Sequence, residues 1–237
     1  MAEFVRVIVS GDGRSIVYNA AGYVNFRKSL STGQTDQICS ECGWPTHMNF
    51  DGTEALFESA DEAERLLIWS GGKVRPLIAG PDRPTRMEFG GRFSPNGKWV
   101  ALCAGARNTV AREIFVVPNA RGAAVTDDQW VPISEGQTGE REPYWSPDGR
   151  RLFFISDRDG FRCVWERPMD PETGRPTGPA SPVAHFHHAR ELLRSPVTAR
   201  AGMSWGAIGL TASADSLIFT IAESTGNLWW RHEAPGR

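Results

Sequence analysis

The chain has 237 residues, a formal net charge of −2 and a hydrophobic content of 40%, so it can bury a substantial core as one domain. The near-neutral charge gives no reason to expect a nucleic-acid partner or an anionic membrane surface. No apolar run approaches the roughly 20 residues of a transmembrane helix, so we expect no membrane insertion. Residues 1–6 lack the basic and apolar segments of a signal peptide, and we expect a soluble chain without an export address.

Taken in chain order, the most regular feature is a short turn sequence that separates apolar runs. In Ser146-Pro147-Asp148-Gly149, proline presets φ, aspartate tolerates the third turn position, and glycine accepts positive φ. This predicts a type I turn closed by a left-handed residue. Copies lie at 10–13, 49–52 and 94–97, with a degenerate fifth at 213–216.

The apolar runs that follow these turns predict strands. Residues 152–155 are apolar at every position, and residues 99–102 behave in the same way. An unbroken apolar run bounded by turn signals is typical of a strand buried on both faces.

Each turn and its strands belong to a repeat of roughly 40 residues, which is typical of a β-propeller blade. We therefore predict an all-β fold, a β-propeller of four-stranded blades with about five blades present. The predicted repeats are 1–42, 43–80, 86–134, 140–188 and 207–231. The predicted strands are 5–9, 16–18, 24–26 and 37–39; 48–50, 55–57, 66–69 and 74–78; 91–93, 99–103, 114–117 and 130–133; 143–145, 152–155, 163–165 and 182–186; and 217–219 and 228–230.

The last repeat lacks a fourth strand, because residues 231–237 are short and polar. The sequence favours a piece of a six- to eight-bladed propeller, with one to three blades ahead of Met1. The alternative is closure as five blades with residues 2–5 as the latch. In the first case an unpaired edge strand would invite association.

These repeats resemble the TolB-like (WD40-like, PD40) β-propeller repeats of bacteria, whose hallmark is an aromatic residue followed by Ser-Pro-Asp-Gly. Residues 93–97 and 145–149 match it well, 10–13 lacks the proline, 49–52 departs at two positions, and 213–216 keeps the serine and the aspartate. The resemblance implies a non-catalytic module that binds a protein or peptide, either in the periplasm with the Tol-Pal system or as the sensor part of a membrane-bound kinase. Similar propellers also gate serine peptidases of the prolyl oligopeptidase type, which is the enzymatic alternative. The resemblance favours an extracytoplasmic location.

Blade geometry predicts where a ligand would bind. The tight turns share one face, and the longer connections within and between blades open on the opposite face, at 42–47, 58–64, 78–90, 104–112, 135–142 and 186–207. Binding concentrates on long loops held by a rigid scaffold. On or beside these segments lie the predicted binding residues, which are His47, Arg86, Arg141, Glu142 and Arg158.

Three motifs have a chemical interpretation that we weigh against a simpler one. Cys39 and Cys42, with His47 nearby, could form half of a zinc site, a disulfide or redox thiol pair, or a loop pair without function. The loop pair is favoured, because no second cysteine pair exists to complete a zinc site.

His185 and His187 would share a face of a strand, which makes a two-histidine metal site conceivable. No carboxylate lies at useful spacing in the sequence, so we expect a rim strand or loop there, including His188.

The third motif is the G-x-S-x-G pattern at 202–206, followed by Asp215 and His232 in hydrolase order. The nucleophile elbow needs a strand before it and a helix after it within a large α/β sheet, and the sequence here predicts strands. We interpret the pattern as a glycine-rich loop. No catalytic residue, cofactor or metal is predicted.

Overall fold

The computed structural model describes residues 6–61, 64–80, 86–106, 112–136, 139–187, 191–193, 210–213 and 215–223. Regular structure in this part of the chain is almost entirely β-strand, together with two single-turn 3₁₀ helices, η1 (Ala21–Tyr23) and η2 (Asp127–Gln129). Among the same residues, no helix has the length and apolar character needed to cross a membrane.

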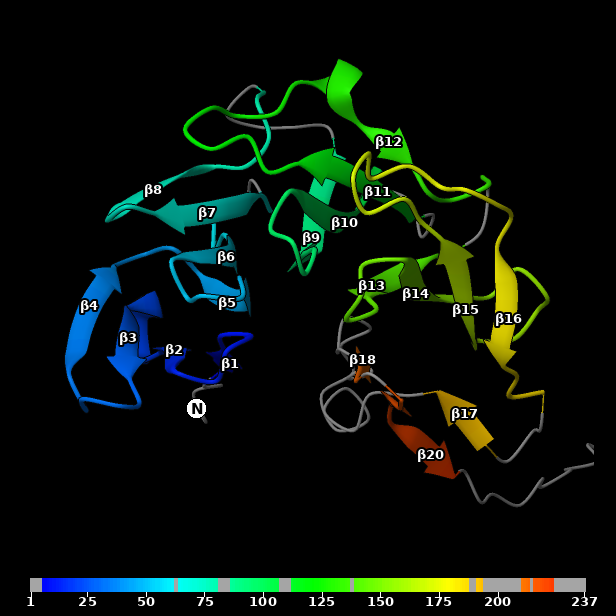
Figure 1. The fold of residues 1–237 in the computed structure, drawn as a ribbon, viewed down its shortest axis with the longest axis horizontal. Helices are drawn as coiled ribbons and strands as arrows, with labels where there is room; N and C mark the ends of the chain where they lie inside the picture. Colours follow the sequence, from blue (N-terminus) through cyan, green and yellow to red (C-terminus); the bar gives the residue numbers. More distant parts are fainter. Residues whose placement is uncertain are drawn as a thin grey trace, which may run out of the picture.

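Four antiparallel sheets each contain four strands that follow one another in chain order. Their strands are β1 (Val7–Val9), β2 (Ser15–Asn19), β3 (Asn25–Ser29) and β4 (Thr35–Cys39); β5 (Trp44–Met48), β6 (Glu54–Glu58), β7 (Leu66–Ser70) and β8 (Lys73–Pro76); β9 (Arg86–Phe93), β10 (Trp99–Ala106), β11 (Glu113–Pro118) and β12 (Val131–Pro132); and β13 (Arg141–Trp145), β14 (Arg151–Ser156), β15 (Cys163–Pro168) and β16 (Ser181–Ala184). Figure 1 shows these sheets arranged in chain order around a common centre. The predicted all-β propeller of four-stranded blades is confirmed.

A fifth group of strands continues the arc. β18 (Thr211–Ala212) pairs with β19 (Leu217–Ile218), and β17 (Glu191–Leu193) pairs with β20 (Ile221–Glu223). β19 and β20 follow closely along the chain, and the two pairs form separate two-stranded sheets. This group brings the propeller to about five blades.

The core lies between neighbouring sheets, and this explains the unbroken apolar runs. Successive residues of a strand point to opposite faces. Val100 and Leu102 therefore join the cluster between the second and third sheets, whereas Ala101 and Cys103 join the cluster between the third and fourth. Residues 152–155 behave in the same way, with alternate side chains packing on the third sheet and on the β17–β20 group. Both predicted runs are strands buried on both faces.

The recurring turns share one hydrogen-bond pattern. In the best copy, Ser146 Oγ donates to Asp148 Oδ1 (2.5 Å), Arg150 N donates to the same oxygen (3.0 Å), and Arg151 N donates to Ser146 Oγ (2.9 Å). Gly149 has φ +70°, as the turn requires. The hydroxyl and amide donors lower the pKa of the Asp148 carboxyl. Asp12 accepts the equivalent bonds from Ser10 Oγ and Arg14 N, whereas Asp51 accepts from both the amide and the hydroxyl of Thr53. The pKa values of both carboxyls are also lowered.

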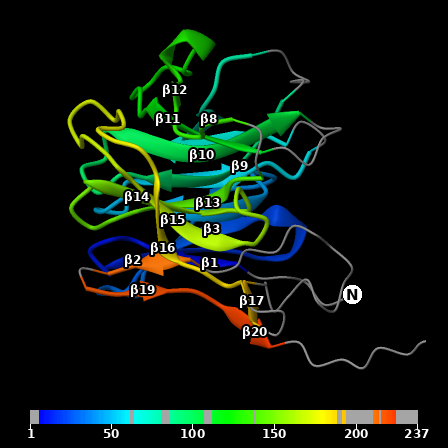
Figure 2. The same cartoon turned by 90° about the vertical axis from the view of Figure 1, so that its right-hand side faces the viewer.

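All of these turns lie at one end of the sheets, called here the turn face. Asp12 N donates to Phe50 O (2.8 Å), which links the first two turns, and Gly149 lies beside Pro95 in the turn before it. Because the strands are antiparallel, the connections from second to third strands, and from one sheet to the next, leave from the opposite end, called here the loop face. Figure 2 shows the sheets edge-on, with these two ends on opposite sides.

Several segments predicted as loops contain strand. β9 begins at Arg86, inside the predicted loop 78–90. β5 begins at Trp44 rather than at 48, so most of the predicted loop 42–47 is strand; Pro45 is tolerated there because β5 pairs with a single strand, β6. β17 lies inside the segment predicted as loop 186–207. The predicted strand 228–230 falls outside the described residues.

Candidate functional site at the loop face

Three predicted site residues lie at the loop-face ends of first strands. Arg86 pairs with Ala106 at the last position of β10, and Arg141 pairs with Ile155 near the end of β14. Glu142 follows Arg141 in β13, where the register shifts. The innermost strands of the third and fourth sheets therefore present these charged residues where they reach the loop face.

Glu142 has an unusual backbone conformation. Its φ of +55° is in the left-handed region, and the corresponding bulge of β9 has Gly90 with φ +66°. A non-glycine residue held there costs on the order of 1–3 kcal/mol, and such strain is often found at functional sites. Beside it, Arg141 Nε is buried and has no hydrogen-bond partner among the described residues.

Arg86 has a partly exposed side chain. Its guanidinium lies over the Trp130 ring, 4.5 Å from the centroid, and Nη2 lies 3.4 Å from Asp127 Oδ2. Both side chains of this ion pair are well exposed, so the pair contributes little to stability. Arg86 can therefore exchange Asp127 for another acidic group at small cost.

Arg158, by contrast, binds other side chains of the same sheet and its neighbouring connections. Its guanidinium pairs with the fully buried Glu140 and with Glu135 (3.1 Å), and lies 4.5 Å from the centroid of Trp165. Arg158 Nε also donates to Ser156 Oγ (3.1 Å). These contacts fasten the β14–β15 connection to the segment that enters β13, so Arg158 holds the loop face in shape.

His47 does not lie on a loop, which corrects its predicted placement. It sits in β5, opposite Leu56, near the turn-face end of the strand. Its Nδ1 accepts a hydrogen bond from Phe93 N (3.1 Å) and so links the second and third sheets. Burial, with a smaller contribution from the charge of Arg92, lowers the pKa of His47 to about 3, so the ring is neutral at physiological pH.

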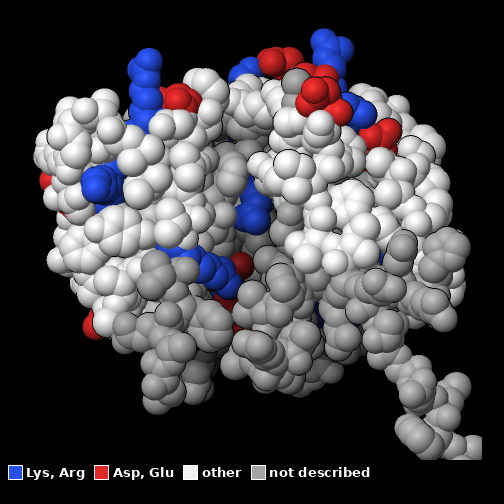
Figure 3. All heavy atoms as spheres, turned by 90° about the horizontal axis from the view of Figure 1, so that it is seen from below, with Lys and Arg blue, Asp and Glu red and all other residues white. Residues whose placement is uncertain are grey.

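Hydrogen bonds between first strands hold the inner edges of the sheets together. Arg92 Nη1 donates to Thr46 O (2.8 Å), and Trp145 Nε1 donates to Arg92 O (3.3 Å). At the end of the second strand β6, Glu58 also accepts from Gly90 N of β9 (2.9 Å) and pairs with Arg6, just before β1 (2.9 Å). Seen from below the view of Figure 1, a hollow opens between the first sheet and the last ones, with Lys or Arg side chains inside it and acidic side chains beside them (Figure 3).

Glu88 is a buried carboxyl on the same strand as Arg92. It is 6% exposed, and burial raises its pKa to about 7 despite the hydrogen bond that Leu66 N donates to Oε2 (3.3 Å). A carboxyl with this pKa exchanges a proton near neutrality. Its burial between β7 and β9 keeps it from direct contact with a ligand.

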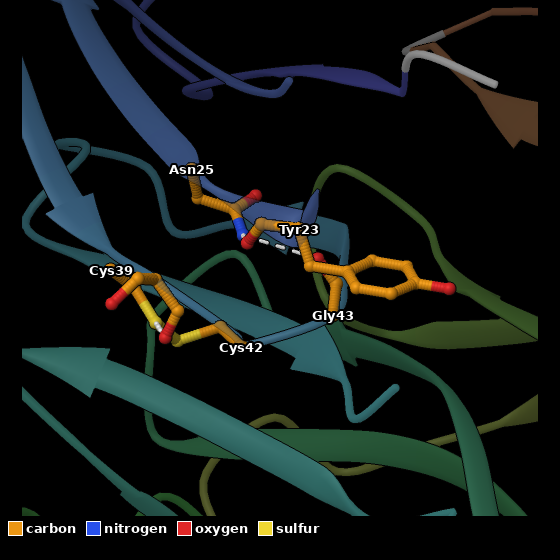
Figure 4. Close-up of a disulfide and its surroundings, with 6 residues drawn as sticks. Tyr23, Asn25, Cys39, Cys42 and Gly43 are labelled. Atoms are coloured by element: carbon orange, nitrogen blue, oxygen red, sulfur yellow. Dashed lines mark hydrogen bonds between the residues drawn. A yellow bond between two sulfur atoms is a disulfide. The ribbon is translucent and has the colours of Figure 1, made fainter. Parts of the chain in front are cut away.

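Cys39 and Cys42 form a disulfide, with their Cα atoms 6.0 Å apart. This corrects the favoured interpretation of a loop pair without function, and it excludes the zinc half-site with His47, because neither sulfur is a free thiolate. Figure 4 shows the disulfide next to Asn25, whose Nδ2 donates to Tyr23 O (2.8 Å) and Gly43 O (3.1 Å). The disulfide and the amide together hold the crossing from β4 to β5.

No protein-family model matches the chain, and no curated protein matches it. Solved structures do. A protein described as TolB from Agrobacterium tumefaciens has a TM-score of 0.57 at 21% identity, over 79% of this chain and 64% of that one. TolB from Acinetobacter baumannii has a TM-score of 0.55 at 16% identity, over 78% and 45% of the two chains. The chain has a TolB-like β-propeller fold.

The TolB-like propeller spans less than two thirds of either TolB protein, so their whole-protein roles do not transfer with the fold. It is also similar to a puromycin-hydrolyzing peptidase from Mycobacterium tuberculosis, with a TM-score of 0.54 at 18% identity, over 79% of this chain and 34% of the peptidase. At these identities the likeness establishes the propeller alone. Solved structures with this fold include an enzyme, the peptidase, so the fold alone does not decide the function.

The propeller brings together four potential metal ligands that the sequence analysis did not join. Asp159, Cys163, His185 and His187 have ligand atoms that all lie within 4.8 Å of one another. Asp159 was missed because it lies 28 residues from His187 along the chain, far outside a local spacing motif. The β15–β16 pairing, with Val164 opposite Ala184, places Cys163 near His185. Because 163–165 and 182–186 were predicted as neighbouring strands, the proximity of these two residues could have been predicted from the sequence.

The remaining motifs lie partly outside the described residues. The G-x-S-x-G pattern at 202–206, His188 and His232 belong to the parts of the chain that the structure does not describe. Asp215 is described, and it accepts a hydrogen bond from Ser213 Oγ (2.9 Å) in the fifth turn. It therefore occupies the turn position of Asp12 and Asp148.

Proposed function

We propose that this propeller is a non-catalytic binding module that presents its loop face to a protein or peptide partner. The supporting observation is the difference between its two faces. The turn face has the short, internally hydrogen-bonded turns, and its long β15–β16 connection (169–180) is packed against the third sheet, where Pro171 O accepts from Asn96 Nδ2 and Trp99 Nε1. The loop face has the inter-sheet connections and the ends of the first strands. Long connections on a rigid scaffold are where binding concentrates.

The charges at the loop face favour a partner with acidic and polar groups. Arg86 is held by a weak surface ion pair, and Arg141 has a buried donor with no partner among the described residues. Arg86 can gain hydrogen bonds on binding a carboxylate, which arginine contacts in a bidentate manner, and Arg141 adds a second positive charge to this face. Glu142, beside them, would add selectivity against a uniformly acidic surface.

The proposed setting is an extracytoplasmic one, as the sensor part of a larger envelope or kinase-linked protein. The disulfide between Cys39 and Cys42 supports it, because disulfides persist in oxidising compartments and are rare in the cytosol. The resemblance to bacterial TolB-like repeats points in the same direction.

A selection experiment with two matched variants tests the proposal. Peptides would be selected from a displayed random library against the full chain, and their affinities measured for Arg86→Ala/Arg141→Ala and for Lys98→Ala/Arg150→Ala. Both variants remove two positive charges, the first at the loop face and the second at the turn face. We expect the first to weaken binding at least about tenfold, the equivalent of roughly 1.4 kcal/mol, and the second to leave it nearly unchanged. Loss of binding in the turn-face variant alone would overturn the proposal.

A second candidate is the propeller of a serine peptidase of the prolyl oligopeptidase type. The similarity to the mycobacterial protein, a puromycin-hydrolyzing peptidase of which this chain spans 34%, supports a peptidase context. In that protein class the hydrolase is a separate domain, so the propeller itself would again be non-catalytic. The adjoining coding sequence separates the two candidates: an in-frame hydrolase domain would support the peptidase, and an in-frame kinase or signal peptide would support the binding module.

A further inference from the structure

Three separate segments of the fourth sheet converge at its loop-face end. Asp159 lies in the β14–β15 connection, Cys163 begins β15, and His185 and His187 follow β16. The β15–β16 register, with Val164 opposite Ala184, brings the start of β15 against the residues that leave β16. The fold thus places four side chains of metal-ligating type together from distant points of the sequence.

The atoms of this group meet at nearly a single point. Asp159 Oδ2 lies 3.1 Å from His185 Nδ1 and 2.9 Å from His187 Nε2. The two ring nitrogens lie 3.1 Å apart, and Cys163 Sγ is within 4.8 Å of all three. In a tetrahedral zinc site, with bonds of about 2.0–2.3 Å, neighbouring ligand atoms lie roughly 3.3–3.7 Å apart. The observed spacing is close to that of such a site.

We propose that Asp159, Cys163, His185 and His187 bind a zinc ion. Two imidazole nitrogens, one thiolate and one carboxylate are four ligands of the kinds that zinc uses. Calcium and magnesium prefer oxygen ligands and do not fit a set with three nitrogen or sulfur donors. This proposal departs from the expectation of no metal, and it does not depend on the proposed binding function.

The packing around the group fixes the orientation of its ligands. The His187 ring stacks on Phe161 with centroids 4.7 Å apart, and the His185 ring lies edge-on to Trp165 at 6.0 Å. Phe186 N donates to Cys163 Sγ (3.4 Å), a bond that stabilises a thiolate. Ligand side chains held by neighbouring packing and hydrogen bonds are a feature of working metal sites.

Cys163 is the most deeply buried of the four proposed ligands. Its side chain is fully buried, whereas those of His185 and His187 are 43% and 44% exposed and that of Asp159 is 23% exposed. A catalytic cysteine has to be reached by its substrate, which this burial prevents. A metal ligand only has to reach the ion, and the ion supplies the positive charge that stabilises a buried thiolate.

Bound zinc would clamp the end of the fourth sheet. It would tie the β14–β15 connection to the segment after β16, where Phe186 packs against Phe219 with ring centroids 5.4 Å apart. Phe186 also shares a buried cluster with Leu193 of β17. The ion would therefore strengthen the junction between the fourth sheet and the β17–β20 group, and four protein ligands indicate a structural role.

Metal titration of the full, folded chain tests the proposal. After treatment with a chelator, zinc would be titrated in by calorimetry, and cobalt would be used as a spectroscopic substitute, because a thiolate ligand gives a charge-transfer band. We expect one ion per chain and a cobalt–thiolate band. At free zinc about 100-fold above the dissociation constant, the melting temperature should rise by roughly 5–10 °C.

Variants decide whether these four residues hold the ion. His187→Gln and Asp159→Asn replace partly exposed side chains, so they should fold, and each should weaken zinc binding at least about tenfold. Cys163→Ala should abolish the cobalt–thiolate band. Asp170→Asn, on the turn face of the same sheet, and Cys39→Ser/Cys42→Ser should leave binding unchanged.

Two results would overturn the proposal. The first is a full chain that binds no zinc, in which case the four residues form only a hydrogen-bonded cluster around Asp159. The second is binding that survives His187→Gln and Asp159→Asn, or that disappears in Cys39→Ser/Cys42→Ser, because the ion would then lie elsewhere.

Discussion

The third sheet and the first sheet have the same strand order and the same kind of turn, yet their second strands are buried differently. In β10, residues 100–104 are all fully buried. In β2, Val17 is fully buried, but Ile16 and Tyr18 on either side of it remain partly exposed. The first strands differ in the same sense, since Val7 and Val9 of β1 are 56% and 52% exposed.

The difference follows from the number of neighbours that each sheet has in the described part of the chain. Alternate residues of β10 enter two clusters, one on each side, whereas β2 contributes Val17 to a single cluster shared with the second sheet. A strand of a stacked blade needs apolar residues at every position only when both of its faces are covered. The burial pattern of a second strand therefore reports how many sheets pack against it.

The largest expected effect tests this comparison directly. Leu102→Ala, in the middle of β10, should lower the free energy of unfolding by about 3–5 kcal/mol, because it leaves a cavity between two packed sheets. Val9→Ala, on the exposed face of β1, should change it by about 0.5 kcal/mol or less. Urea unfolding followed by tryptophan fluorescence would measure both. Similar losses for the two variants would show that β1 is covered in solution and would break the comparison.

A second prediction concerns the junction of the first two sheets. Gly43 has φ +89°, and a Cβ there would lie 1.9 Å from Glu58 O. Gly33, in the β3–β4 turn, has φ +75° and nothing within 4 Å of such a Cβ. Gly43→Ala should therefore cost about 2–4 kcal/mol, from strain and overpacking, whereas Gly33→Ala should cost about 1 kcal/mol, from strain alone.

Thermal unfolding of the two glycine variants would measure the difference. Both introduce the same methyl group at positive φ, so Gly33→Ala is the control for backbone strain. Equal losses of stability would mean that the chain entering β5 can move away from the end of β6 to accommodate the added methyl group, and that the β4–β5 crossing is held less firmly than the contacts around Asn25 and the disulfide indicate.

Features whose physics is local could be predicted from the sequence. The turn at 146–149 is formed by the serine, aspartate and glycine within it, so four residues suffice to predict it. The unbroken apolar run 152–155 predicts a strand that is buried on both faces. The first strand of the second sheet was predicted at 48–50, but β5 covers Trp44–Met48, where an innermost strand tolerates Pro45.

Features that depend on long-range placement could not be predicted in the same way. Two cysteines three residues apart are compatible with a disulfide, a thiol pair or a metal half-site, and only the backbone geometry at the β4–β5 crossing distinguishes them. Arg158 and His47 were selected as charged or polar residues near loops, but their partners Glu140 and Phe93 come from other segments. Asp159 joins His187 through the folded sheet rather than through sequence spacing.

The smallest expected effect concerns pH and again contrasts two sheets. The pKa of His47 falls from 6.5 to about 3 on folding, so between these values the unfolded chain binds more protons and stability rises with pH. The pKa of Glu88 rises from 4.5 to about 7, so between these values the folded chain binds more protons and stability falls as pH rises. From pH 4.5 to 6.5 the two contributions oppose each other, each with a slope of up to about 1.4 kcal/mol per pH unit.

Single substitutions should separate these opposing slopes. His47→Gln leaves the contribution of Glu88, so stability should fall as pH rises through this window, and Glu88→Gln should make it rise. The double variant should match the shallow dependence of the unsubstituted chain, which controls for the loss of each side chain's contacts. Urea unfolding at several pH values in the window would give the slopes. Slopes of the same sign in the two single variants would show that at least one of the groups is not held in its uncharged form between the second and third sheets.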